Sequence, residues 1–281
     1  MVRAYLRSHI GVRTYVLALV CVLLLAGLVL RLIGTLQPHP ALAAWDRVHQ
    51  AGSYHFHADI TQITTPLASV TNVGRTSTRN AFYLQGATNL QEETMQMRLW
   101  SEESSVLLPG NGMEMRVEDG QAYARQGGQE WEAVDNALGA FAPGGDFLGY
   151  LVGARDLHEV GSETRTLPTG ETVSFTRYTF TINGPALAVQ MRERLERQLT
   201  EQGELPPGVA LDMPKSYAEM TGTGELWVGD NGLPLRQILN IQFPPDEDEA
   251  TSAEISINFS RYGQIPAISW WSVAGNWGLK I

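Results

Sequence analysis

Apolar and polar residues alternate with a period of two in segment after segment of this chain. From residue 53 to residue 60 (SYHFHADI), Tyr54, Phe56, Ala58 and Ile60 fall on one side of an extended backbone and the polar residues fall on the other. The alternation recurs at Met95, Met97 and Leu99, at Met113, Met115 and Val117, at Leu239, Ile241 and Phe243, and at Ile255, Ile257 and Phe259. Strands of a parallel sheet covered on both faces would be continuously apolar instead. The pattern therefore predicts antiparallel strands with one buried face.

Turn residues separate these predicted strands. Aspartate or asparagine followed by glycine is a strong hairpin signal. Such turns, or a Pro-Thr-Gly equivalent, occur at Asp119-Gly120, Pro168-Thr169-Gly170 and Asp230-Asn231-Gly232. Strands that follow each other along the chain are therefore expected to be neighbours in a meander.

One strand-like segment, residues 172–183, changes its apolar phase. Its first apolar residues occupy odd positions, whereas Tyr178, Phe180 and Ile182 occupy even positions. An extra residue in one strand of an antiparallel pair shifts the alternation in this way. The sequence therefore predicts a β-bulge near Thr176 and Arg177.

Helical periodicity is confined to a few segments. Residues 41–51 are expected to form a brief helix that ends at Gly52, and short helices are expected at 136–141 and 146–152. A longer helix is expected to begin at Asn183-Gly184-Pro185 and to run to about residue 202, because proline is favoured in the first turn. Its apolar residues recur every four positions, at Leu187, Met191, Leu195 and Leu199. This stripe must pack against an apolar surface.

The apolar segment 15–33 (YVLALVCVLLLAGLVLRLI) is about as long, at about 1.5 Å per helical residue, as the hydrocarbon core of a bilayer is thick. Arg3, Arg7 and Arg13 precede it, so the positive-inside rule places the N-terminus in the cytoplasm. We therefore expect a single-pass signal-anchor in the cell membrane, with the C-terminal body extracytoplasmic. Two processing alternatives stay open, namely signal-peptide cleavage near Ala43 and lipidation of Cys21.

The charge of the body argues against nucleic acid as a partner. Four of the 20 basic residues precede position 34 and all 30 acidic residues follow it, so the body carries 16 basic against 30 acidic side chains. A body of this charge repels phosphate backbones. The single cysteine, Cys21, lies in the apolar segment, so the body forms no internal disulfide and holds no thiolate metal site.

The chain lacks the sequence motifs of the common enzyme classes, including G-x-S-x-G, G-x-x-x-x-G-K and H-E-x-x-H. His55, His57 and Asp59 share one strand face at a spacing that suits a metal, yet no further ligand lies nearby in sequence, so we interpret them as solvent-facing. Residues 246–249 (DEDE) lack the spaced ligands of a calcium loop. We therefore expect no catalytic residue, no metal site and no cofactor.

Methionine is concentrated on two successive predicted strands. Met95, Met97, Met113 and Met115 are half of the eight methionines, and all four fall on predicted apolar faces. Surfaces that accept varied apolar ligands are rich in this flexible, polarizable side chain. Ordinary core packing is the alternative interpretation.

Three stretches, 115–134 (MRVEDGQAYARQGGQEWEAV), 221–241 (TGTGELWVGDNGLPLRQILNI) and 255–268, together with the order of features, resemble the LolA-like group of lipoprotein and lipid carriers, particularly the LppX/LprG-type lipoproteins. The resemblance covers about residues 41–268. It implies an α+β, mainly β fold, in which a strongly curved antiparallel sheet forms an incomplete barrel. Helices would cover the concave side, which would hold acyl chains.

This resemblance implies that the apolar faces line one cavity, which raises a ligand-lining role for the methionines above simple packing. The expected lining residues are Tyr54, Phe56, Met95, Met97, Leu99, Met113, Met115, Leu187, Met191, Leu195, Leu239 and Ile241. The expected function is a membrane-anchored, non-catalytic module that binds lipid, lipoprotein acyl chains or another apolar ligand. The alternative is a sensor or interaction domain of the same fold in envelope regulation, with an envelope protein as its partner.

The expected organisation is a cytoplasmic N-terminus at 1–14, a transmembrane helix at 15–33, a tether at 34–43, a lipid-binding domain at 44–268 and a Trp-rich tail at 269–281. The chain departs from the family in two respects. Family members diffuse freely or are attached through a lipidated cysteine, whereas this chain is expected to be anchored by a helix. The tail (SWWSVAGNWGLKI) has no family counterpart, and its tryptophans suit a membrane interface unless the chain is one piece of a longer protein.

Overall fold

The computed structural model describes residues 39–101, 112–118, 121–127, 129–134, 146–166, 172–201, 203–206, 208–213, 215–246 and 248–264. The chain divides into two units, Met1–His39 and Pro40–Ile281, and the elements below belong to the second. The predicted membrane span at 15–33, the predicted helix at 136–141 and the Trp-rich tail lie outside the described residues. No helix of the described part is both long and apolar enough to cross a bilayer.

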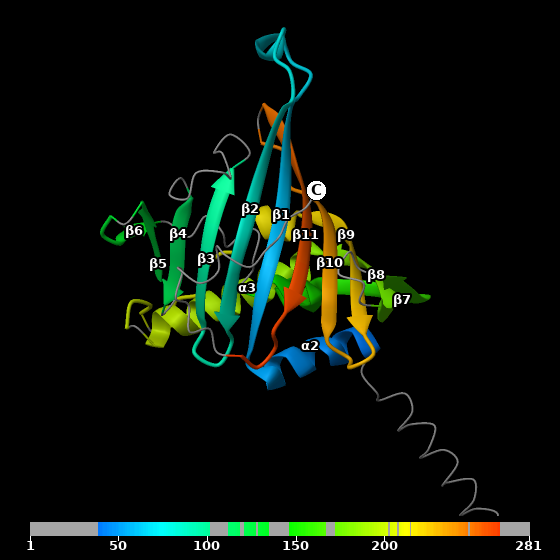
Figure 1. The fold of residues 1–281 in the computed structure, drawn as a ribbon. Coiled ribbons are helices and arrows are strands. Elements are labelled where there is room, and N and C mark those ends of the chain that lie inside the picture. The colour runs from blue at the N-terminus through cyan, green and yellow to red at the C-terminus, as the bar shows by residue number, and fades with distance from the viewer. Residues whose placement is uncertain are drawn as a thin grey trace, which may run out of the picture. The chain divides into compact units, whose positions relative to one another are not determined.

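Eleven strands form one antiparallel sheet with the order β6-β5-β4-β3-β2-β1-β11-β10-β9-β8-β7 (Figure 1). The strands are β1 (Ser53–Pro66), β2 (Thr78–Asn89), β3 (Thr94–Ser101), β4 (Met113–Glu118), β5 (Gln121–Gln126), β6 (Glu132–Val134), β7 (Ala154–Thr166), β8 (Thr172–Asn183), β9 (Thr221–Gly229), β10 (Pro234–Gln242) and β11 (Glu249–Ser260). Strands β1 to β6 form one meander and β7 to β11 form another, as the turn signals predict. Pairing of β1 with β11 joins the two meanders.

The sheet is open, because β6 and β7 lie at its two edges, and it is neither closed nor strongly curled. The fold is therefore mainly β and α+β as expected, but the predicted strong curvature is wrong. Sheets curl strongly where bulges and glycine kinks are distributed along their strands. Here the register runs without a shift from β10 through β11, β1, β2, β3 and β4 to β5.

The predicted bulge near Thr176 and Arg177 is also wrong. Strand β8 pairs with β9 without interruption from Phe175 to Asn183, and the irregularities lie in the neighbouring strand β7. Phe175 belongs to the outer face of the sheet, where its ring stacks on Trp227 at a centroid distance of 4.4 Å. The change of apolar phase thus marks a buried aromatic pair on the outer face.

In the described part of the chain, five helical elements accompany the sheet: α2 (Pro40–Ala51), η1 (Val70–Asn72), η4 (Phe147–Gly153), α3 (Gly184–Glu201) and α4 (Lys215–Ala218). Helix α2 confirms the prediction for 41–51, and Gly52 ends it with a φ of 78° and a backbone hydrogen bond to Val48. Helix α3 begins where predicted, and the Asn183 side chain accepts a hydrogen bond from the Ala186 N–H at 3.0 Å. The short helix predicted at 146–152 is the 3₁₀ helix η4.

The apolar core lies on one face of the sheet, between the strands and the helices. All strands except β6 contribute buried residues to it. Register partners lie side by side, as Phe56 of β1 does with Phe259 of β11 and with Gly86 of β2. Figure 1 shows α2 across one end of the central strands and α3 behind the sheet. Helices α2 and α3 contribute Val48 and Leu187 to this core.

Two glycines let large side chains lie flat on this inner face. A Cβ on Gly224 would stand 2.1 Å from the Phe180 ring, and one on Gly86 would stand 2.2 Å from the Gln96 carbonyl oxygen and 2.7 Å from the Met97 Cβ. Glycine is thus required at both positions, because the neighbouring backbone and side chains fill the space that a Cβ needs.

We expect Gly224→Ala to lower the free energy of unfolding by about 1–3 kcal/mol, because the new methyl overlaps the Phe180 ring. The matched control is Thr223→Ala, an exposed position on the same strand, which should stay within about ±0.5 kcal/mol. Denaturant unfolding in a fixed detergent measures both. Equal stability of the two variants would contradict the close approach.

Candidate functional site

Eight of the twelve predicted lining residues belong to the one buried core. These are Tyr54, Phe56, Met95, Met97, Met115, Leu187, Leu239 and Ile241. Leu99 and Met191 are partly buried and pack against this core. Met113 and Leu195 lie at its margin, where 40% of Met113 and 44% of Leu195 is exposed. The sheet and helix thus gather most of the predicted set, and in this state these residues are packed against one another.

The methionines that the sequence singles out lie side by side on the inner face of β3 and β4. Met97 is the register partner of Met115, and Met95 is the partner of Val117. We call Met95, Met97 and Met115 the methionine face. All three side chains are buried, so this part of the sheet is covered.

Helix α3 packs tightly only at its N-terminal half. Along its apolar stripe, Leu187 is buried, Met191 is partly buried and Leu195 is largely exposed. One ion pair joins the middle of this helix to the turn before β3, with Arg194 Nη2 3.5 Å from Glu93 Oε1. The middle of α3 therefore lies near the start of β3, and the apolar stripe of its outer half is only partly buried, with Leu199 half-buried and Leu195 44% exposed.

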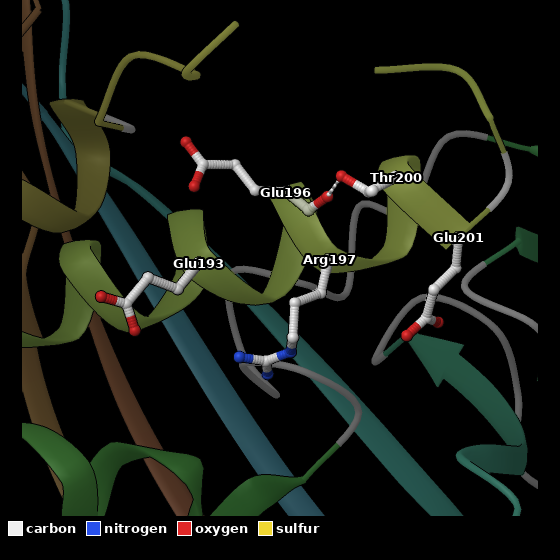
Figure 2. A pocket seen from close by; sticks show the side chains of 5 residues that line it. All are labelled: Glu193, Glu196, Arg197, Thr200 and Glu201. Carbon is white, nitrogen blue, oxygen red and sulfur yellow. Dashed lines mark hydrogen bonds between the residues drawn. The ribbon is translucent and has the colours of Figure 1, made fainter. Parts of the chain in front are cut away.

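Two surface hollows of the described part have volumes of about 410 and 400 Å³. The first lies along α3 and is lined by Glu193, Glu196, Arg197, Thr200 and Glu201, which Figure 2 shows projecting from the helix. The second is lined by residues of β7, β8, α4 and the start of α3. Neither hollow is lined by a residue of the predicted set, so neither is the expected apolar cavity.

A buried polar network around Asp146 was missed from the sequence. Asp146 Oδ1 accepts hydrogen bonds from the Tyr54 hydroxyl at 2.8 Å and from the Leu148 N–H at 2.9 Å, and Oδ2 accepts one from the Trp45 indole at 3.0 Å. The Tyr54 hydroxyl in turn accepts a hydrogen bond from the Phe147 N–H at 3.1 Å. Burial, reinforced by the Asp146 carboxylate, raises the pKa of Tyr54 well above its ordinary value. The network fixes η4 and α2 to the first strand.

Gln237 completes the attachment of η4 to the sheet. Its side chain is fully buried, and its amide donates a hydrogen bond to the Phe147 carbonyl at 2.9 Å. The amide oxygen has no hydrogen-bond partner. The sequence holds one signal for each residue. Gln237 is a polar residue on an otherwise apolar strand face, and Asp146 follows Pro-Gly-Gly, a position suited to a helix cap.

The histidines of β1 lie on the outer face, as interpreted. His57 is exposed, and its Nε2 is 3.6 Å from Asp59 Oδ1. Burial and the nearby Arg261 guanidinium lower the pKa of His55. Among the described residues, no group of three or more histidine, cysteine, aspartate or glutamate side chains is arranged to hold a metal ion.

Arginine and aromatic side chains cover the rest of the outer face. Arg125 lies 4.6 Å from the Trp131 ring centre, and Arg116 lies 4.8 Å from it. Glu114 pairs with Arg98 and Arg125. Burial alone would raise the pKa of Glu114, but the two arginine hydrogen bonds outweigh it and lower that pKa.

We expect Tyr54→Phe to lower the free energy of unfolding by about 1–3 kcal/mol, because the Phe147 N–H loses its acceptor and Asp146 loses a donor inside the core. The matched control is Tyr83→Phe. The Tyr83 ring stacks on Trp100 on the outer face, so this variant should change the free energy of unfolding by less than about 0.5 kcal/mol. Thermal unfolding in one detergent compares them. A Tyr54→Phe variant as stable as the control would mean that the network contributes nothing.

Comparison with known proteins gives structural similarity without sequence similarity. No protein-family model matches the chain. No curated protein matches it either. Among solved structures, the crystal structure of LprF from Mycobacterium bovis is similar, with 13% identity and a TM-score of 0.35 over 83% of this chain and 96% of that chain.

A second solved structure is more distant. It is the β-barrel-like protein of a domain of unknown function, DUF1849, from Brucella abortus. The match has 7% identity and a TM-score of 0.24 over 74% of this chain and 98% of that chain.

Proposed function

We propose that this protein binds an apolar ligand, such as a lipid or the acyl chain of a lipoprotein, between the methionine face and helix α3, and that it performs no chemistry on the ligand. The observation that carries the proposal is the pairing of Met97 with Met115 beside a helix whose apolar stripe is only half buried. An acyl chain in this position would cover Leu195, which is 44% exposed. Methionine side chains adapt to chains of different length and shape because they are unbranched and flexible.

Ligand entry requires α3 to move away from the sheet, because the methionine face is closed in this state. The contacts that resist the movement are weak at the outer half of the helix. The Arg194–Glu93 ion pair joins side chains that are 36% and 69% exposed, and exposed pairs of this kind contribute on the order of 0–1 kcal/mol. The inner half, held by Leu187 in the core, would act as the fixed end.

The full set of expected lining residues belongs to this proposal. Tyr54, Phe56, Leu239 and Ile241 form the floor next to the methionine face, and Leu99 and Met113 form its margin toward the loop after β3. Met191 and Leu195 are the contacts from the helix.

We also propose that residues 15–33 anchor the chain in the cell membrane and that the domain from 44 to 268 lies outside the cytoplasm. The support is the length of the apolar segment and the arginines that precede it. The binding domain would then stay at one membrane, where it receives or presents its ligand.

The binding site is tested with Met97→Gln and Met115→Gln, compared with Ile257→Gln as the matched core variant. A glutamine in a closed core costs on the order of 1–3 kcal/mol, and the cost is smaller where a neighbouring element can move away and admit water, as we propose for α3 at the methionine face. We expect the methionine variants to remain folded and to bind a fluorescent fatty acid about tenfold more weakly, and Ile257→Gln to lose stability first.

Two results would contradict the site. The methionine variants could unfold as readily as Ile257→Gln, which would make them ordinary core residues, or they could bind the probe as well as the parent chain. Mass spectrometry of the purified full chain adds an independent measurement. A bound protein partner and no lipid would favour the sensor or interaction domain.

Membrane topology is tested by adding protease outside intact cells. We expect degradation of the body and survival of a small membrane-embedded N-terminal fragment, because the arginines hold the N-terminus inside. Immunoblotting with tags at both ends detects the fragments. A soluble mature protein that begins near Ala44 would mean that the apolar segment is a cleaved signal.

A further inference from the structure

The hairpin between β1 and β2 ends in a tip, residues 67–77, that exposes two valines almost completely. Val70 is 92% exposed and Val73 is 82% exposed. The other large apolar side chains that the described part exposes reach at most 50%. Single exposed apolar residues are common on protein surfaces, whereas exposed apolar residues that gather in one place mark contact surfaces.

The tip projects because three strands continue beyond their neighbours. The pairing of β2 with β3 begins at Phe82, so the first residues of β2 pair with β1 alone. The pairing of β11 with β10 begins at Ser252, although β11 starts at Glu249. Figure 1 shows the resulting extension above the rest of the sheet, with η1 at its end.

Hydrogen bonds from the buried side chain of Asn72 hold the tip in an ordered form. The Asn72 side chain is buried and donates to the Leu67 carbonyl at 2.8 Å and to the Asp248 carbonyl at 2.9 Å. Arg75 Nη1 donates to Asn72 Oδ1 at 2.9 Å and Arg75 also pairs with Glu249. The exposure of the valines is thus a property of an ordered loop, since these bonds prevent them from folding back onto the stem.

The charge of the hairpin differs from that of the rest of the body. Residues 61–80 (TQITTPLASVTNVGRTSTRN) contain two arginines and no acidic residue in a chain with 30 acidic residues. The acidic groups of the adjoining loop include Asp248, which accepts a hydrogen bond from Thr71, and Glu249, which pairs with Arg75. Hydroxyl groups of serine and threonine surround the valines. The adjoining loop 246–249 (DEDE) sets four acidic residues against the two arginines, so the tip is apolar at its end and polar, without a net positive charge, behind it.

We infer that the tip enters the interfacial region of a lipid bilayer through Val70 and Val73. A convex tip needs no complementary pocket when its partner is a bilayer, and its arginines and hydroxyls would lie at the level of the lipid headgroups. A protein partner would need a pocket shaped to receive two valines. This inference rests on the hairpin alone and stands whether or not the methionine face binds lipid.

The experiment places an environment-sensitive dye at the tip. Cys21 is the only cysteine, so a Cys21→Ser chain accepts Val70→Cys or, as the matched control, Val160→Cys, a half-exposed valine on edge strand β7. The full chain is reconstituted in phosphatidylcholine vesicles with and without phosphatidylglycerol, and doxyl-labelled lipid is placed either in these vesicles or in added protein-free vesicles. We expect a blue-shifted emission and quenching of the dye at position 70, and neither at position 160.

Quenching by doxyl lipid in the protein's own vesicles or in the added vesicles supports the inference and tells which bilayer the tip meets. Emission typical of water in every vesicle, or equal quenching at positions 70 and 160, would overturn it. A dye that stays in water with vesicles but is buried on addition of cell-extract proteins would also overturn it, in favour of a protein partner.

A second measurement uses the unlabelled full chain and the vesicles whose doxyl lipid quenches the dye at position 70. The double variant Val70→Ser with Val73→Ser should weaken the vesicle contact about tenfold or more, because two apolar side chains no longer leave water. Its thermal unfolding should match that of the parent, since both side chains are already exposed. Unchanged vesicle contact in this folded variant would overturn the inference.

Discussion

The pairing of the first strand with the last holds this fold together. β1 and β11 pair residue for residue from His55–Ser260 to Pro66–Glu249, so side chains about two hundred positions apart become neighbours. Without this contact the chain would contain two separate meanders, each with one uncovered apolar face. Pairing over such a separation closes a long loop before it gains any contact, and folding of such topologies is slow. The register is nevertheless strict, because a shift by one residue would turn every apolar side chain to the solvent.

The step from β6 to β7 carries the chain from one edge of the sheet to the other, and η4 is the described helix in that connection. Its position depends on a few buried polar contacts. Asp146, Tyr54 and Gln237 attach its start to β1 and β10, while the Phe147 ring packs on Phe56 at a centroid distance of 4.7 Å. Buried polar groups cost free energy unless they are bonded, so the hydrogen bonds that Asp146 accepts and that the Gln237 amide donates favour this one arrangement. It therefore specifies where the connection crosses the core.

The proposed function depends on a difference in rigidity between the core around η4 and α2 and the core around the methionine face. Around η4 and α2 the core is fixed by hydrogen bonds and edge-to-face aromatic contacts, as between Tyr54 and Phe259 with ring centres 5.4 Å apart. Around the methionine face the side chains are flexible, and α3 is held at its outer half by a partly exposed ion pair. A protein that must admit an apolar ligand without unfolding needs both, a rigid part that keeps the sheet register and a part whose contacts separate at low cost.

The sequence by itself predicted β1, β3, β4, β8, β10 and β11, their alternation of apolar and polar residues and a meander order, because a period of two and the turn residues are local properties. It also predicted α2 and α3 and placed Met95, Met97 and Met115 on one face. Only the tertiary structure decided that β1 pairs with β11, that the sheet stays open, and that Leu195 and Met113 lie at the margin of the core. Those outcomes depend on contacts between distant segments, which no local pattern encodes. The Asp146 network and the stacking of Phe175 on Trp227 belong to the same class, since each joins residues more than fifty positions apart whose types are unremarkable in sequence.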